Sequence, residues 1–573
     1  MTQTCTAPAG EEATLAKLQE HEPTSFGAMF LDRAARQPDA VAYLRPGPDG
    51  WQPQTWAQTA RAVTEIAAGL LALGLRPEDR VAIISGTRVE WIEADFGVMC
   101  AGGATTTVYP SSSPDEVAHI LTDSGSRFAI VESPDLLSGT IFDGTPVEHL
   151  ILIDGNDPRA MPMADLRALG APAAVREAVA RVRPDDLATL IYTSGTTGLP
   201  KGVRVTHRAW IYQGLAIQAM GIVHPDDLGY LWLPLSHAFG KALLSCQLSV
   251  GFRFAVDGDV SRIVQRLAEV RPTIMPAVPR IFEKVYAAVG AAPGVRNRLL
   301  RWAVGVAEKR KSGWRFLIAD RLVLSKVRAR FGGRMRFFIS GAAALSPDIA
   351  RWFDAIGLPI AEGYGLTESC ATTIFNRPDR PEYGTVGRPL PGTSVRIAED
   401  GEVLLRGPGL MQGYHRLDSG SVLVDGWLHT GDIGEITPHG SLRITDRKKD
   451  LIKTSNGKYV APQAIESRFK AICPLAGQVV VHGEKRKYIT ALIDLDPDAL
   501  AASGITGAAA IRAELQACVD RLNQTLNPWE TIKRFAVLDQ PLSIENGELT
   551  ASLKLRRRVI EERYRPVLDG LYT

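Results

Sequence analysis

Cysteine is scarce in this sequence, and its spacing argues against two kinds of site. The 573 residues include six cysteines, Cys5, Cys100, Cys246, Cys370, Cys473 and Cys518. They form no C-x-x-C pair, and none has a close histidine partner at metal-ligand spacing. A disulfide framework and a zinc site are therefore not expected. Scattered free thiols are typical of a protein in the reducing cytoplasm.

Long apolar runs and an excess of one charge are also missing. The longest uncharged stretch, residues 96–114, contains three threonines and three serines, so it suits a membrane span poorly. The first twenty residues show no charged segment followed by an apolar one, and no signal peptide is predicted. Lys and Arg number 65 and Asp and Glu 63, a net charge of +2 that indicates no nucleic-acid partner. We expect a soluble protein.

One short basic run, Arg556–Arg558, stands out near the C-terminus. It has two interpretations: a solvated helix face, or a contact with phosphate or with an anionic membrane surface. Peripheral contact with the inner face of a membrane therefore stays open, beside a cytoplasmic location.

The chain has the composition of a globular protein and the pattern of an α/β fold. Hydrophobic residues make up 45% and charged residues 22%. Helix-like and strand-like segments alternate through the first half, which predicts largely parallel, buried sheets. Residues 384–446 read as short strands separated by Gly and Pro, and predict a small β-rich subdomain. A smaller segment of helices and strands follows, so we place the domains at 1–448 and 449–573.

A glycine-rich loop follows a buried strand in the middle of the chain. The strand LATLIY leads into the segment Thr193, Ser194, Gly195, Thr196, Thr197, Gly198, Leu199, Pro200, Lys201 and Gly202. Glycines let backbone amides approach phosphate oxygens, and four hydroxyls and one ammonium add further donors. The segment is not a Walker A loop, because Pro200 stands where that pattern needs a glycine. The alternative is a flexible surface turn.

This segment resembles the phosphate loop of the adenylate-forming superfamily, which includes acyl-CoA synthetases, peptide-synthetase adenylation domains and beetle luciferases. Other segments similar to that family follow in the right order along nearly the whole chain. The resemblance implies a large N-terminal domain of two α/β subdomains plus the β-rich subdomain. It also implies a smaller, mobile α+β C-terminal domain that rotates about a hinge at Lys449.

The resemblance also assigns the adenosine end of an ATP site. Gly341, Ala342 and Ala343 fall in the adenine segment, where the family pattern is Gly-Gly-Ala-Pro and Ala342 and Ala344 replace a Gly and the Pro. Ala at a Gly position costs little unless φ is positive. The next segment is Glu362, Gly363, Tyr364, Gly365, Leu366, Thr367 and Glu368. Its aromatic ring between two glycines can lie flat against a purine.

Three further positions complete the nucleotide site that the resemblance implies. Thr367 offers a hydroxyl to phosphate, and Glu368 an oxygen ligand to Mg²⁺. Asp432 is matched to the residue that accepts hydrogen bonds from both ribose hydroxyls, and Arg447 to the second ribose-side position. Without the family, the segment around Glu368 reads as a tight turn and residues 446–450 as an exposed charged turn.

The remaining assignments concern the reacting groups. His237 lies in LPLSHAFG, the segment that carries a family His or aromatic residue next to the acyl carboxylate and the α-phosphate. Lys554 matches the C-terminal catalytic lysine, whose ammonium would stabilise charge in the transition state. Arg556 and Arg557 are competing candidates for the same role, but they lie outside the matched positions. Ser455, Asn456 and Gly457 would shape a channel for coenzyme A.

The implied activity is that of an ATP-dependent acid–thiol ligase. A carboxylate and MgATP would give an acyl-adenylate and pyrophosphate, and coenzyme A would then displace AMP. The forms PRIFEKVY, LPLSHAFG and VYPSSSP are most similar to long-chain fatty acyl-CoA synthetases. Three alternatives stay open: a ligase for another carboxylic acid, a fatty acyl-AMP ligase that loads a carrier protein, and a non-catalytic acyl- or nucleotide-binding protein.

Overall fold

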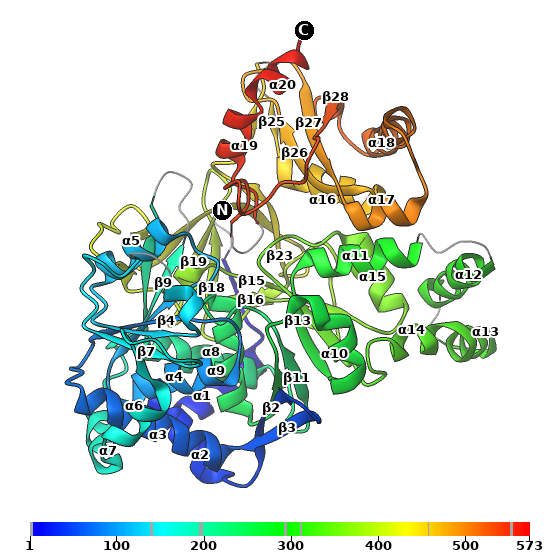
Figure 1. Ribbon diagram of the computed structural model, residues 1–573. Coiled ribbons are helices and arrows are strands. Elements are labelled where there is room, and N and C mark those ends of the chain that lie inside the picture. Colours follow the sequence, from blue (N-terminus) through cyan, green and yellow to red (C-terminus); the bar gives the residue numbers. More distant parts are fainter. Residues whose placement is uncertain are drawn as a thin grey trace.

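Two large sheets form the centre of the protein (Figure 1). The computed structural model describes residues 4–137, 141–193, 199–290, 295–309, 312–455, 458–550 and 554–573. The eight-stranded sheet has the order β20 (Gly413–Tyr414), β10 (Lys201–Thr206), β9 (Leu187–Thr193), β5 (Ala104–Val108), β4 (Arg80–Ile84), β6 (Phe128–Val131), β7 (His149–Leu152), β8 (Met161–Pro162). The nine-stranded sheet has the order β17 (Arg388–Pro389), β16 (Ile374–Phe375), β15 (Ile360–Tyr364), β14 (Phe337–Ser340), β13 (Ile274–Ala277), β11 (Leu228–Leu231), β12 (Arg253–Val256), β2 (Val41–Gly47), β3 (Gly50–Thr55).

The nine-stranded sheet is parallel in its middle and antiparallel at both edges, whereas the eight-stranded sheet is antiparallel only at its β20–β10–β9 edge. Strands β5, β4 and β6 pair in parallel and are almost completely buried, as their continuous apolar or Thr-rich sequences predict. The antiparallel pairs β9–β10 and β2–β3 lie toward the edges. The predicted α/β class is therefore confirmed.

Helices cover the faces of these sheets. In the first half they are α1 (Ala9–Gln19), α2 (Phe26–Arg36), α3 (Trp56–Ala72), α4 (Val89–Cys100), α5 (Pro114–Ser124), α6 (Met163–Leu169), α7 (Pro172–Arg181), α8 (His207–Ala219), α9 (Ala238–Val250) and α10 (Ile263–Val270). The helices that come next are α11 (Pro279–Gly290), α12 (Val295–Lys309), α13 (Trp314–Ala319), α14 (Ser325–Ala329) and α15 (Pro347–Ala355), and the group α12 to α14 projects away from the sheets. Helix α3 begins with a capping box of Thr55 and Gln58, which satisfies amides of its first turn. It packs on α4 at Gly97, where a Cβ atom would lie 2.6 Å from Ile66.

A third sheet takes most of its strands from the Gly- and Pro-rich region. It contains β1 (Thr4–Thr6), β18 (Ser394–Ile397), β19 (Glu402–Arg406), β22 (Trp427–Ile436), β21 (Leu423–Val424) and β23 (Leu442–Arg447). Two short strands from the same region, β17 and β20, pair with the large sheets instead. The region is thus less separate than its sequence suggests, because β1 from the other end of the chain forms one edge of its sheet.

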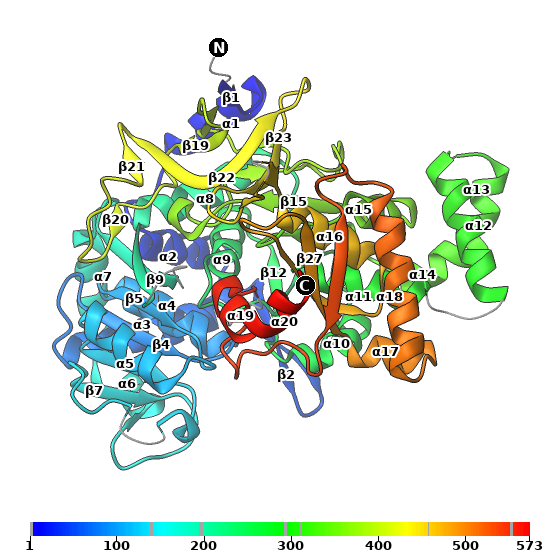
Figure 2. The same ribbon diagram turned by 90° about the horizontal axis from the view of Figure 1, so that it is seen from above.

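The last part of the chain has hydrophobic clusters of its own. Its elements are β24 (Ile452–Lys453), β25 (Tyr459–Val460), α16 (Pro462–Ile472), β26 (Ala476–His482), β27 (Ile489–Leu495), α17 (Pro497–Ser503), α18 (Ala508–Asn523), β28 (Ile532–Val537), α19 (Arg557–Arg563) and α20 (Arg565–Gly570). In Figure 1 this part, yellow to red, stands above the rest. Figure 2 shows it from above, in front of the sheets. Among the helices of the described ranges, none is both long and apolar enough to span a membrane.

The run Arg556–Arg558 is not simply a solvated helix face. The Arg557 guanidinium is mostly buried and donates to both carboxylate oxygens of Glu466, at 2.9 and 3.0 Å, and to the carbonyl oxygen of Val481. Arg558 is the exposed member and pairs with Glu562. The run therefore divides, because only one of its side chains faces inward to hold α19 against α16 and β26.

Candidate active site

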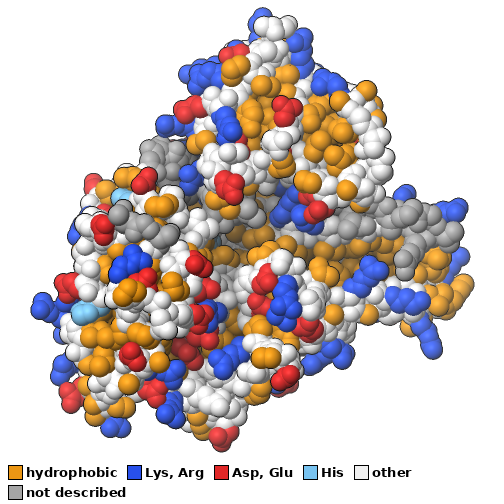
Figure 3. All heavy atoms as spheres, in the orientation of Figure 1, with side chains coloured by type: hydrophobic (Ala, Val, Ile, Leu, Met, Phe, Trp, Pro, Cys, Tyr) orange, Lys and Arg blue, Asp and Glu red, His pale blue; other side chains and the backbone are white. Residues whose placement is uncertain are grey.

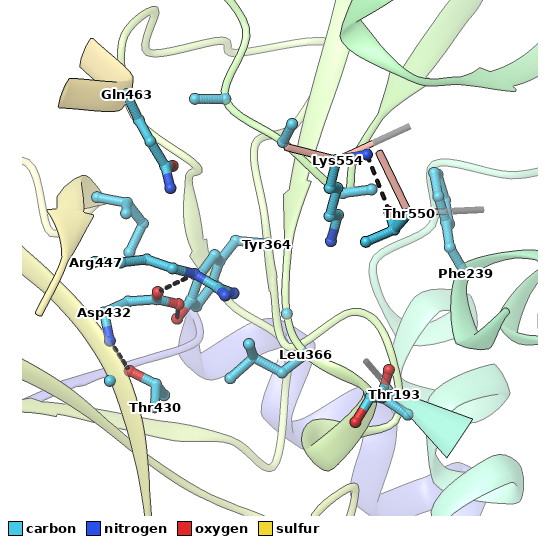
Figure 4. Close-up of a pocket in the computed structure, with 18 of the residues that line it drawn as sticks. Thr193, Phe239, Tyr364, Leu366, Thr430, Asp432, Arg447, Gln463, Thr550 and Lys554 are labelled. Atoms are coloured by element: carbon cyan, nitrogen blue, oxygen red, sulfur yellow. Dashed lines mark hydrogen bonds and ion pairs between the residues drawn. The ribbon is translucent and has the colours of Figure 1, made fainter. Parts of the chain in front are cut away.

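One cavity of about 1850 Å³ lies where the two hydrophobic cores meet. The carboxyl end of β9 and the loops that follow β14 and β15 line it from the N-terminal core, at the carboxyl ends of parallel strands, which is where open α/β sheets bind ligands. The opposite wall comes from residues 461–468, 544–550, 554 and 556 of the last part of the chain. Residues more than 350 positions apart in the sequence therefore share one cavity, as the close-up in Figure 4 shows.

Tyr364, Asp432 and Arg447 form a connected polar group on one wall. Asp432 on β22 and Arg447 on β23 are direct cross-strand partners, so the sheet itself places them together. Arg447 Nε lies 3.1 Å from Asp432 Oδ1, and the Tyr364 hydroxyl donates to Asp432 Oδ2 at 2.6 Å. Burial raises the pKa of Asp432, and Arg447 and the Tyr364 hydroxyl oppose that rise. The network fixes the Tyr364 ring and leaves a carboxylate and a guanidinium beside it.

Lys554 enters the cavity from the opposite side. In Figure 4 its ammonium points into the space between Tyr364 and Thr193. Its backbone amide donates to Thr550 Oγ1 at 3.0 Å, which holds the segment that carries it. Burial, with the nearby Arg447 guanidinium, lowers the pKa of Lys554 to about 8, although Asp432 and Glu368 act in the other direction. Of the two competing basic residues, Arg557 is bound to Glu466 and is absent from the cavity lining, whereas Arg556 lines the cavity.

Glu368 and Lys201 meet through a residue that the sequence analysis missed. The Tyr414 hydroxyl donates to Glu368 Oε1 at 2.8 Å, and Lys201 Nζ lies 5.6 Å from the centre of the Tyr414 ring. Tyr414 belongs to β20, whose pairing with β10 brings it beside the strand that Lys201 begins. No local sequence signal marks it, because only this pairing gives it a place in the site.

Glu368 is a carboxylate in this site that could hold a metal ion together with a phosphate ligand. Among the described residues, no group of three or more His, Cys, Asp and Glu side chains could hold a metal ion by itself. Glu368 faces the cavity and has a free coordination position on each oxygen beyond the Tyr414 contact. Mg²⁺ usually takes one or two carboxylates and completes its shell with phosphate oxygens and water. The donor set therefore fits a Mg²⁺ ion that arrives with a phosphate ligand.

His237 lies at the N-terminus of α9 and is uncharged. Its Nδ1 atom accepts a hydrogen bond from the backbone amide of Phe239 at 3.1 Å. Burial, together with the charge of Lys554, lowers the pKa of His237 to about 3. The neutral ring therefore carries its proton on Nε2, as a hydrogen-bond donor. The Phe239 ring covers Gly341, where a Cβ atom would lie 3.0 Å from Phe239 Cε1.

The backbone is strained at Ala342, in the adenine segment, and crowded at Gly365, in the segment from Glu362 to Glu368. Ala342 has a φ of +71°. This left-handed conformation costs an Ala free energy that a Gly would not lose. A Cβ atom on Gly365 would lie 1.6 Å from the carbonyl oxygen of Ala371, so this position needs glycine. At Gly363 the nearest atom would be 3.5 Å away, an ordinary contact.

Glu362 lines the cavity from β15, but most of its surface is buried in the cavity wall. Its side chain is buried on β15, and its Oε1 atom has no hydrogen-bond partner among the described residues. Burial raises the pKa of Glu362 to about 8, and a backbone hydrogen bond from Leu345 opposes this. The carboxyl group is therefore mostly protonated at neutral pH and suits a structural or hydrogen-bonding role better than a charged one.

The other expected site residues fall into three groups. Thr193, Ala343 and Thr367 line the cavity. Lys449 also lies at its edge, in an exposed turn between β23 and β24, whereas Ser455 is not among the lining residues. Seven of the residues expected to bind phosphate or coenzyme A lie outside the described ranges: Ser194, Gly195, Thr196, Thr197, Gly198, Asn456 and Gly457.

Known proteins resemble the chain over nearly all of its length. Residues 30–415 match the family model of the AMP-binding enzyme, and residues 449–573 that of the AMP-binding enzyme C-terminal domain. The long-chain-fatty-acid–CoA ligase FadD15 of Mycobacterium bovis is 34% identical over 96% of this chain and 97% of its own. The peroxisomal long chain acyl-CoA synthetase 6 of Arabidopsis thaliana is 29% identical over 90% of this chain and 81% of its own.

A solved structure shares the fold at lower identity. The A domain of carboxylic acid reductase from Segniliparus rugosus, in complex with AMP and a co-purified carboxylic acid, superposes with a TM-score of 0.76. It is 21% identical and covers 98% of this chain and 97% of its own. With a family model that spans well over half of its residues, the chain belongs to the AMP-binding enzyme family.

Proposed function

We propose that this protein is an ATP-dependent long-chain fatty acid–CoA ligase that acts through an acyl-adenylate and releases AMP and pyrophosphate. One observation carries the proposal: Lys554 reaches, from the C-terminal core, into the cavity that holds the Tyr364–Asp432–Arg447 group. The names of relatives that are similar over nearly the whole chain support the substrate class.

In the first half-reaction a carboxylate oxygen of the acid attacks the α-phosphorus of MgATP, and the bond from that phosphorus to the bridging oxygen breaks. Tyr364 would stack on the adenine, while Asp432 and Arg447 bind the ribose. Lys554 and the Nε2 proton of His237 would contact the oxygens that gain charge, and Lys201 the departing pyrophosphate. Glu368 would hold Mg²⁺ against the phosphates.

In the second half-reaction the sulfur of coenzyme A attacks the acyl carbonyl carbon. The carbonyl-to-phosphate oxygen bond breaks, AMP leaves, and the thiol proton passes to solvent. This step needs Lys554 out of the way and a path for the thiol, which rotation of the C-terminal domain about Lys449 would provide. Ser455, Asn456 and Gly457 would then form part of that path.

The cavity also offers apolar surface for an acyl chain. Phe239, Leu366 and Ala371 line it close to the reacting groups. The side chains of α9 beyond Phe239, such as Leu244 and Leu248, are instead packed in the main core. The acyl chain would therefore begin at Phe239 and run along the loop that follows Tyr364.

The test is acid-dependent release of AMP and pyrophosphate with MgATP and coenzyme A, over acids from acetate to oleate and a set of aryl acids. We expect AMP and acyl-CoA to form in equal amounts and fastest with the long-chain acids. A maximum with an aryl or short-chain acid would replace the substrate class and leave the chemistry standing.

Two other outcomes would overturn the proposed reaction itself. Pyrophosphate and bound acyl-adenylate without acyl-CoA would make the protein a ligase that loads a carrier protein. No acid-dependent product at all, from protein that binds ATP, would indicate a non-catalytic member of the family.

A further inference from the structure

A helical projection stands out from the body of the protein. It consists of α12, α13 and α14, joined by the π-helical turn Asp320–Leu324, and in Figures 1 and 2 it extends to the right, away from the sheets. Its inner side is packed, with Ala303, Ala307 and Leu324 buried between the helices. The outer side is therefore free to present a surface of its own.

That outer side is unusually apolar. The exposed large apolar side chains of the projection are Leu299, Trp302, Trp314, Leu317, Ile318 and Leu322. Trp314 and Leu317 keep 68% and 66% of their surface exposed. Positions 314, 317, 318 and 322 follow helical spacing and so form one stripe. Six of the 17 large apolar side chains exposed among the described residues thus fall in 24 consecutive positions.

The same segment is strongly basic. Residues 295–334 hold 12 of the 65 Lys and Arg residues but only two of the 63 Asp and Glu residues. The rest of the chain is therefore net negative. One of the two acidic side chains, Asp320, is neutralised by an ion pair with Arg328 at 2.7 Å, and the other is Glu308.

Basic and apolar side chains alternate over this surface. Arg315, Arg321 and Lys326 are exposed, and Arg315 Cζ lies 5.5 Å from the centre of the Trp314 ring. Figure 3 shows hydrophobic atoms, in orange, beside Lys and Arg, in blue, on the projection at the right. An amphipathic helical face of this kind inserts its aromatic and aliphatic side chains at the lipid headgroup boundary, while cations contact anionic headgroups.

We propose that the projection formed by α12, α13 and α14 docks the protein on an anionic lipid bilayer. Trp302, Trp314 and Leu317 would enter the headgroup region, and Arg315, Arg321 and Lys326 would lie at its surface. A bilayer fits the charge better than a second copy of this chain, because the basic projection of one copy would face the equally basic projection of another in a symmetric pair. The proposal goes beyond the ligase activity and does not rest on it.

The test is flotation of the full-length protein with vesicles, without ATP, coenzyme A or acid. One set of vesicles is phosphatidylcholine alone, and the other is phosphatidylcholine mixed with phosphatidylglycerol. We expect binding to the anionic vesicles, weakened by added salt. The double variant Trp314→Ser/Leu317→Ser should bind at least about tenfold more weakly. The triple variant Arg315→Gln/Arg321→Gln/Lys326→Gln should lose the preference for anionic lipid.

The control is Leu169→Ser/Val567→Ser, which removes two apolar side chains that lie outside the projection and are 49% and 42% exposed. It should bind vesicles like the parent protein. Circular dichroism and ligase activity on a water-soluble short acid should be unchanged in all variants, which separates docking from folding and catalysis. Equal binding by the Trp314 variant and the parent would overturn the proposal. So would a dimer in light scattering that only this variant loses, which would assign the face to a second copy.

Discussion

At the scale of single residues, the protonation of Lys554 sets a limit on the pH range of the reaction. Its pKa of about 8 follows from burial and from Arg447, so above that pH most molecules lack the ammonium. We expect the rate of pyrophosphate formation to fall through an alkaline limb with a midpoint near pH 8, since only the charged form stabilises the transition state. Acid-dependent pyrophosphate release across this range measures it. A flat profile through pH 8 would contradict the role.

Removal of the same ammonium should separate the two half-reactions. Lys554→Ala is expected to lower adenylate formation by roughly 10²- to 10³-fold or more, as loss of a donor to developing charge does. Thioester formation from supplied acyl-adenylate should stay near the parent rate, because the proposed mechanism uses the lysine only in the first step. Arg558→Ala, an exposed neighbour, is the control and should change neither. Equal loss in both half-reactions would remove Lys554 from this role.

Ala342 carries a backbone cost that one substitution can reveal. A left-handed φ costs an Ala roughly 1 to 2 kcal/mol, whereas Gly adopts it freely but orders at a cost of about 0.5 to 1 kcal/mol. Ala342→Gly should therefore raise the free energy of unfolding by roughly 0.5 kcal/mol. Ala343→Gly, without a positive φ, should lower it by a similar amount. Urea unfolding of both variants measures these free energies. If Ala343→Gly were the more stable variant, the positive φ of Ala342 would not be a source of strain.

At the scale of elements, the loop after β15 depends on one of its two glycines. The turn at Gly365 brings the chain so close to Ala371 that a methyl group there must displace the loop holding Thr367 and Glu368. Gly365→Ala should thus lower adenylate formation at least about tenfold and raise the KM for ATP. Gly363→Ala has room for its methyl group and should stay within about twofold of the parent. Similar losses in both variants would contradict the crowding argument.

The elements that sequence patterns predict well are those whose cause is local. The strand Leu187–Thr193 follows from a continuous apolar run, and α3 from its capping residues and amphipathic spacing. The same patterns do not reveal that β1 pairs with β18, whose Val395 lies 390 positions after its partner Cys5, or that β20 pairs with the eight-stranded sheet. Those pairings depend on which distant segments meet in the folded chain. For that reason, the sequence does not predict that Tyr414 belongs to the site.

At the scale of the whole molecule, the order of the motifs predicts which residues form the site, and the structure shows how those residues are arranged around the cavity. Sequence similarity points to Asp432 and Arg447 separately, and only the register of β22 and β23 makes them a pair. The positive φ of Ala342 and the protonated Glu362 also lie beyond sequence reasoning, because both arise from the surrounding fold. The basic character of residues 295–334 is visible in the sequence, whereas the exposure of Trp314 and Leu317 is not.

The mobility of the C-terminal part can be tested at its connection to the rest. Lys449 stands in the turn between Lys448, which pairs with Asp400 and Glu402 of the N-terminal part, and Asp450, which accepts from Gln463 of α16. Both neighbours are thus anchored, one to each part, and rotation would have to occur between them. Lys449→Pro fixes φ near −65° and should spare adenylate formation while slowing thioester formation. Lys449→Ala, which leaves the backbone free, should leave both half-reactions near the parent rate. Single-turnover measurement of each half-reaction checks this, and normal overall turnover in the proline variant would count against rotation at this residue.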